Sequence, residues 1–95
     1  MSKIPIYFMP GLAAGPEIFE NLELDSDIYE LNYLKWIKPI SLDESLANYT
    51  MRMTDEITHK NPVLVGVSFG GILVQEMSKY IDTRKIIIVS SVKSN

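Results

Sequence analysis

The sequence predicts an α/β protein with three layers, in which helices cover both faces of a mostly parallel sheet of about four strands. Four apolar runs of strand length alternate with segments whose apolar residues recur at helical spacing. The third and fourth runs are apolar at nearly every position, which is typical of strands covered on both faces of a parallel sheet. The 95 residues fit one domain, spanning positions 1–95.

The first half of the chain predicts two strands and a short helix. The first strand is expected over Ile4–Met9, because this apolar run is closed by the turn Pro10-Gly11. A loop of small residues follows, and Pro16 is placed to begin a short helix through about Leu22. The next strand is expected over Tyr29–Leu34, where the alternating pattern indicates one less buried face.

The second half predicts two helices and two strands. Ser41 and Glu44 form a capping-box pattern that predicts the start of a long helix, and Asn61-Pro62 predicts its end. The expected apolar stripe of this helix consists of Leu42, Leu46, Tyr49, Met53 and Ile57. A strand over Val63–Val67, a second helix and a strand over Lys85–Ser90 complete the pattern.

The connections between parallel strands are expected to be right-handed, which limits the possible sheet topologies. The first and third strands are the most apolar early elements, so they belong at the centre and give the spatial order 2-1-3-4. This order brings the loop after the first strand and the turn after the third strand to one crevice. It also leaves one face short of a helix and the fourth strand with an open edge. A homodimer through Lys85–Ser90, or a larger sheet, is therefore expected.

The segment Gly66-Val67-Ser68-Phe69-Gly70 joins the third strand to the helix that follows. A serine is a weak nucleophile unless it is exposed on a tight turn, next to a base and to preorganised backbone donors. Gly66 and Gly70 flank Ser68 at positions where side chains would obstruct the close approach of strand and helix. The loop Pro10-Gly11-Leu12 offers backbone N–H groups at the same crevice. Together these features predict a nucleophile at Ser68.

These residues resemble the α/β-hydrolase family, specifically its small single-domain serine hydrolases. The resemblance covers the chain as the N-terminal half of that family's fold, which implies an incomplete α/β-hydrolase fold. It implies that Ser68 is the nucleophile and that the backbone N–H groups of Phe69 and Leu12 form the oxyanion hole. The glycines that would support this site are Gly11, Gly66 and Gly70. The implied activity is hydrolysis of an ester- or thioester-type carbonyl of a small acyl substrate through an acyl-enzyme.

The acid and the histidine of a catalytic triad follow the serine in this family, and no histidine follows Ser68. The single histidine, His59, is expected at the far edge of the sheet, as a partner of the helix C-terminus. Asp82 is expected at the far end of the second helix. The chain alone is therefore expected to be inactive. The alternatives are a non-catalytic truncated module that completes its sheet by homodimerisation or with another chain, and small-ligand binding in the crevice without chemistry.

Large side chains outside the motif are expected to fill the core rather than a ligand site. This expectation applies to Tyr49, Met53, Met77 and Tyr80. For Trp36 and Tyr33, burial under the second strand is favoured, and lining of an acyl pocket is the alternative.

The composition excludes several classes of partner. The net charge of −3 is dispersed and no basic stripe is present, so nucleic acid is not an expected partner. No apolar run approaches the ~20 residues that span a bilayer. The absence of cysteine excludes disulfides and cysteine-based zinc sites, and no motif predicts a metal or a cofactor. The first residues do not form a signal-peptide pattern, so a cytoplasmic location is expected.

Overall fold

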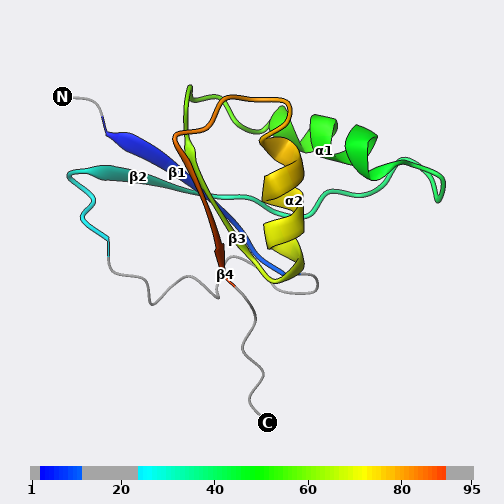
Figure 1. Ribbon diagram of the computed structural model, residues 1–95, viewed down its shortest axis with the longest axis horizontal. Helices are drawn as coiled ribbons and strands as arrows, with labels where there is room; N and C mark the ends of the chain where they lie inside the picture. The colour runs from blue at the N-terminus through cyan, green and yellow to red at the C-terminus, as the bar shows by residue number, and fades with distance from the viewer. Residues whose placement is uncertain (1–2, 12–23, 90–95) are drawn as a thin grey trace, which may run out of the picture.

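The computed structural model describes residues 3–11 and 24–89, and its strands form one parallel sheet (Figure 1). The strands are β1 (Ile4–Met9), β2 (Tyr29–Tyr33), β3 (Val63–Val67) and β4 (Lys85–Val89). They are arranged in the order β2-β1-β3-β4. The predicted α/β class, the parallel sheet and the strand order are therefore confirmed.

Both described helices, α1 (Leu46–Thr54) and α2 (Phe69–Met77), lie on the same face of the sheet (Figure 1). They also contact one another. This arrangement follows from right-handed connections, because the chain moves in the same direction across the sheet from β2 through α1 to β3 and from β3 through α2 to β4. The short helix expected on the other face, from Pro16 to about Leu22, lies outside the described residues.

The main core lies between the sheet and the two helices. Its buried side chains are Tyr7, Met9, Leu34, Met53, Leu64, Leu73, Val74 and Met77. Fully burying one such side chain contributes roughly 1.5–3 kcal/mol, so this cluster accounts for much of the packing between layers. Met53 and Met77 are core residues as predicted, whereas Tyr80 is 40% exposed, contrary to prediction.

Pro5 lies in the central strand β1 without breaking a ladder between strands. The N–H of Ile4 donates to Ile28 O. The backbone N–H and C=O groups of even-numbered residues of β1 therefore point toward β2, and those of odd-numbered residues point toward β3. The pairing of β1 with β3 begins only at Ile6, opposite Val63. The N–H that Pro5 lacks would therefore point to a region that β3 has not yet reached.

Helix α1 is shorter than its sequence pattern predicts at both ends. Ser45, not Ser41, is the N-cap, and its hydroxyl accepts the N–H of Asn48 at 3.0 Å. The helix ends at Thr54 rather than at Asn61-Pro62. Leu42, expected in the apolar stripe, precedes the helix and is fully exposed.

Glu44 does not form the predicted capping box because its carboxylate is held by other groups. Arg52 donates from Nε to Oε2 and from Nη2 to Oε1, each at 2.8 Å. Asn48 Nδ2 donates at 2.7 Å and the backbone N–H of Ile40 at 2.9 Å. These bonds, chiefly those from Arg52, lower the pKa of Glu44 to about 2. The bidentate pair therefore fixes the loop before α1 to the last turn of that helix.

This pair predicts a pH dependence of stability. Because the folded-state pKa of Glu44 lies below its ordinary value of 4.5, its stabilising effect is complete above pH 4.5 and is lost as the pH falls toward 2. The difference in unfolding free energy between the wild type and Glu44→Gln, measured in urea, should shrink over that interval. Asp43→Asn removes a neighbouring exposed charge and should keep the wild-type profile. A difference independent of pH would contradict the assignment.

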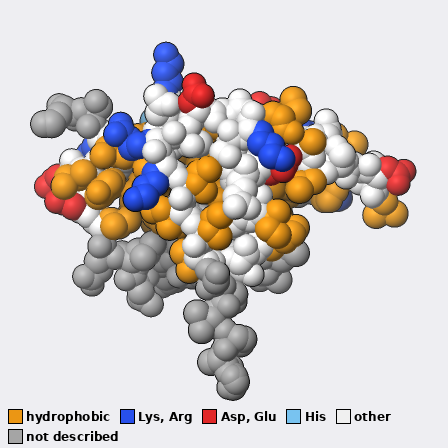
Figure 2. Space-filling model, viewed as in Figure 1, with side chains coloured by type: hydrophobic (Ala, Val, Ile, Leu, Met, Phe, Trp, Pro, Cys, Tyr) orange, Lys and Arg blue, Asp and Glu red, His pale blue; other side chains and the backbone are white. Residues whose placement is uncertain are grey.

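Strand β4 leaves apolar side chains exposed. Ile87, Ile88 and Val89 are 38%, 45% and 44% exposed, and Figure 2 shows hydrophobic side chains on this face of the molecule. Among the described strands, β4 pairs only with β3, so its other edge is open. Ile86 packs against the main core. The predicted lack of cover at the fourth strand is therefore present in the part of the chain that the structure describes.

None of the described helices has the length and apolar character that crossing a membrane requires.

Candidate active site

Ser68 occupies the sharp turn between β3 and α2, and its side chain is exposed. Its backbone has φ 57° and ψ −123°, a conformation that residues other than glycine rarely adopt. Strain of this kind costs about 1–3 kcal/mol and persists only where the surroundings impose it. Here the N–H of Ser68 donates to Val89 O at 2.9 Å, and its carbonyl accepts the N–H of Gly71 at 2.8 Å. The turn is thus held from both sides.

Close backbone packing explains the glycines around Ser68. A Cβ atom on Gly66 would overlap the carbonyl group of Gly70, so β3 and α2 approach more closely than a side chain allows. A Cβ atom on Gly70 would overlap the carbonyl oxygen of Met9, at the end of β1. The contact of Gly66 with Gly70 is the close approach of strand and helix that the glycine pattern predicts, and the contact of Gly70 with Met9 also brings α2 against β1.

The loop after β1 lies beside Ser68. A Cβ atom built on Gly11 would be 3.4 Å from Ser68 Cβ and 3.9 Å from Ser68 Oγ. The loop and the turn thus meet at one crevice, as the strand order predicts. Phe69 is the first residue of α2, so the helix itself does not use its N–H group. Leu12, the second predicted oxyanion donor, lies outside the described residues.

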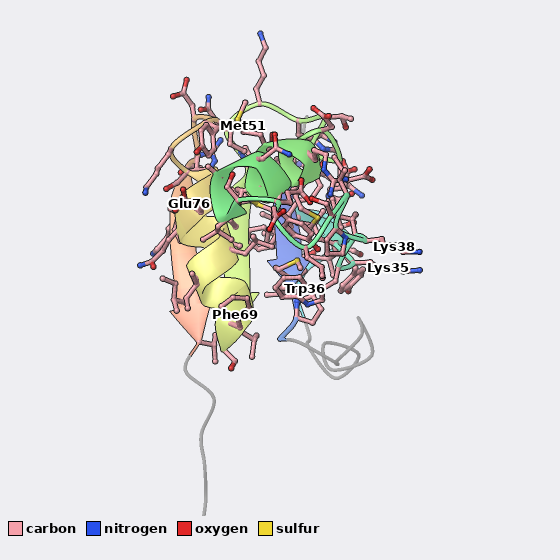
Figure 3. All side chains as sticks on the ribbon, turned by 90° about the vertical axis from the view of Figure 1, so that its right-hand side faces the viewer. Lys35, Trp36, Lys38, Met51, Phe69 and Glu76 are labelled. Atoms are coloured by element: carbon pink, nitrogen blue, oxygen red, sulfur yellow. The ribbon has the colours of Figure 1, made fainter. Side chains whose placement is uncertain are left out.

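Trp36 is half-buried and packs against the main core, so the expected burial is met in part, and its indole N–H binds the loop after β1. Its Nε1–H donates to the carbonyl oxygens of Pro10 and Gly11, both at 3.1 Å. Its ring stacks on Phe69, with 5.7 Å between centroids and 11° between planes (Figure 3). The cause is that β2 ends at Tyr33, so the chain leaves the sheet and runs to the end where Ser68 lies. The position of Trp36 just beyond the end of a strand is the sequence feature that could have predicted its place near Ser68.

Tyr33 differs from both expectations for it. It is 41% exposed, and its ring stacks on Phe8 with 5.3 Å between centroids. Phe8 belongs to the cluster on the sheet face opposite α1 and α2. Tyr33 therefore does not contribute to the surroundings of Trp36.

His59 lies at the other end of the sheet from Ser68, because it precedes β3 whereas Ser68 follows it. Its Nδ1 is 2.7 Å from the Tyr7 hydroxyl, and its Nε2 is 3.1 Å from Glu30 Oε2. The Tyr7 hydroxyl also accepts the N–H of Thr58, which leaves its own proton for His59. The expected contact of His59 with a helix C-terminus is wrong, since α1 has already ended at Thr54.

Asp82 follows α2 and precedes β4, at the end of both elements that is remote from Ser68. Within residues 3–11 and 24–89, no three His, Asp or Glu side chains gather in a way that could hold a metal ion. Among the described residues, the groups available at the crevice are therefore the Ser68 hydroxyl, backbone groups, and the rings of Trp36 and Phe69.

Comparison of the chain with protein-family models, with curated proteins and with solved structures found no match. The interpretation of the crevice therefore depends on its own geometry. Ser68 is exposed and strained at the start of a helix, and Gly11 lies against it.

The packing of the turn predicts unequal effects of two glycine substitutions. Gly66→Ala should lower the unfolding free energy by at least ~2 kcal/mol, because its Cβ would overlap backbone atoms that cannot move independently. Gly11→Ala should be tolerated, because its nearest contacts would be ordinary ones at 3.4 Å and its φ is not positive. Chemical denaturation measures both. Equal losses in the two variants would refute the proposed backbone contact between β3 and α2.

Proposed function

We propose that Ser68 is the nucleophile of a serine hydrolase that acts on an ester- or thioester-type carbonyl of a small acyl substrate. The observation that carries this proposal is the backbone of Ser68, at φ 57° and ψ −123°, in an exposed strand-to-helix turn. This strained turn is the structural context in which a Gly-x-Ser-x-Gly motif presents a nucleophile. The same context supports membership of the α/β-hydrolase family, which is part of the proposal.

The proposed reaction uses the groups around the turn in defined roles. Ser68 Oγ attacks the carbonyl carbon, and the carbonyl oxygen takes the negative charge. The N–H of Phe69 donates to that oxygen from the N-terminus of α2, and the N–H of Leu12 is the second proposed donor. The leaving group departs with a proton, and water then hydrolyses the acyl-enzyme.

The proton of Ser68 Oγ needs a base, and the only histidine in the sequence is bound to Tyr7 and Glu30 at the other end of the sheet. We therefore propose that the base and its acid partner come from outside these 95 residues. The chain alone is expected to turn over substrate poorly. A cytoplasmic location is also part of the proposal and is supported by the absence of cysteine.

A fluorophosphonate probe with imidazole as an external base tests the proposed nucleophile. Imidazole should accelerate covalent labelling in proportion to its concentration, because it replaces the missing base while the backbone donors stabilise the developing charge. Peptide mapping should locate the adduct on Ser68, at least about 100-fold faster than on any other serine.

Two controls make this result specific. Ser68→Ala should abolish labelling without unfolding the protein. Ser26 and Ser78 lie at the other end of the sheet from Ser68 and provide internal references for ordinary hydroxyl reactivity. Equal labelling of Ser68 and these serines in the presence of imidazole would refute the proposal.

The second candidate function is a non-catalytic module that forms a homodimer through β4. The exposed side chains of Ile87, Ile88 and Val89 and the open edge of that strand favour it. A second β4 strand could hydrogen-bond to this edge and cover the apolar side chains, which would bury surface that otherwise faces water.

The dimer is tested by mass. At micromolar concentration, light scattering should give about twice the 10.8 kDa of one chain. Ile87→Lys should shift the mass toward the monomer, because a charge on an edge strand opposes pairing. Met51→Lys, a similarly exposed position on α1, should leave the dimer intact. A folded wild-type monomer at this concentration would exclude the β4 dimer.

A further inference from the structure

An apolar groove begins at the residue that follows Ser68. It has a volume of about 740 Å³ and extends from the Phe69 and Trp36 rings along the first turn of α1. Its apolar wall is completed by Ile37, Pro39, Leu42 and Leu46. Phe69 and Leu46 are 39% and 42% exposed, so both rest against solvent in the absence of a ligand. Sites of this size and character bind small molecules.

Besides the cationic Lys38, the groove is lined by Trp36, Tyr49 and Glu44, whose side-chain hydrogen-bonding groups are already paired within the protein. Trp36 Nε1–H is held by the carbonyls of Pro10 and Gly11. The Tyr49 hydroxyl donates to Ile37 O at 2.6 Å and accepts the N–H of Ile37 at 2.9 Å. The Glu44 carboxylate is neutralised by Arg52 and is only 3% exposed. The wall therefore offers an incoming ligand mainly apolar contact.

The groove is also tied to the proposed nucleophile through a short series of contacts. Trp36 stacks on Phe69 (Figure 3). Trp36 also donates to the carbonyl oxygen of Gly11, and Gly11 lies against Ser68. The two rings are thus fixed at the mouth of the crevice by the same loop that flanks Ser68. A carbonyl positioned over Ser68 can extend a chain directly across Phe69 into the groove.

We propose that this groove binds the apolar chain of the substrate, so that the substrate class is an aliphatic ester or thioester rather than a short or charged one. This assignment rests on the proposed function, because the groove adjoins Ser68. Apolar burial increases with each methylene of such a chain, which gives the groove a preference for length.

Trp36 is the only tryptophan of the chain, so its fluorescence reports occupancy of the groove without any reaction. The probe is 8-bromooctanoate, whose bromine quenches tryptophan and whose chain matches the proposed ligand. Saturable quenching is expected, with an affinity at least about tenfold higher than that of 3-bromopropionate, which carries the same charge on a shorter chain. Equal affinities for the two would overturn the proposal.

Matched variants locate the binding. Leu46→Gln should weaken 8-bromooctanoate binding about tenfold, because it replaces apolar groove surface by an amide. Met51→Gln lies on the same helix away from the rings and should bind like the wild type (Figure 3). Circular dichroism confirms that both variants are folded. Equal effects of the two substitutions would overturn the proposal. A decrease in quenching as the protein concentration rises and a dimer forms would also overturn it, because a second copy would then cover the groove.

The failure of this assignment is distinguishable from the failure of the proposed function. In the Ser68→Ala variant, 8-bromooctanoate should quench Trp36 with the same affinity as in the wild type, because the binding does not depend on the hydroxyl. Chain-length-dependent quenching together with absent fluorophosphonate labelling would refute the nucleophile and support the groove. Labelling of Ser68 without chain-length-dependent quenching would refute the groove and support the nucleophile.

Discussion

The structure depends on one steric constraint, the contact of backbone with backbone where β3 turns into α2. No side chain fits between Gly66 and Gly70, and none fits between Gly70 and Met9. These contacts bring the start of α2 down onto the ends of β1 and β3, which are the two central strands. Ser68 has no freedom to relax, because its N–H and its carbonyl are both bonded. The strained φ of 57° is therefore a consequence of close packing rather than an isolated feature.

The two ends of the sheet carry different chemistry as a result. At the carboxyl ends of the strands, the Ser68 hydroxyl is exposed next to backbone groups and aromatic rings. The other end carries a series of hydrogen bonds from Tyr7 through His59 to Glu30, which joins β1, β2 and the segment before β3. This series fixes the segment between α1 and β3 and occupies both ring nitrogens of His59. The histidine is thereby a structural group in this fold and is separated from Ser68 by the length of β3.

The strands and their order could be predicted from sequence because continuous apolar runs and right-handed connections leave few alternatives. The start of α1 could not, since Ser41 and Ser45 are both good N-caps and the choice depends on Arg52, which draws Glu44 away from the capping box. An acyl pocket lined by Trp36 was only the less favoured alternative from sequence, because the groove forms between Trp36, which lies beyond a strand, and Phe69, which starts a helix. Local patterns do not contain such contacts. The roles of Ser68, Phe69 and Leu12 stay predictions.

The two proposed functions are physically connected through Val89. Its carbonyl accepts the N–H of Ser68, and it is also the last described residue of the open strand β4. A strand that pairs with β4 would restrict the motion of Val89 and so hold the Ser68 turn more firmly. Completing the sheet and ordering the nucleophile are therefore favoured by the same contact. A non-catalytic module would need the apolar edge of β4 but not a serine held at φ 57°, whose strain of about 1–3 kcal/mol is offset by the close packing around it.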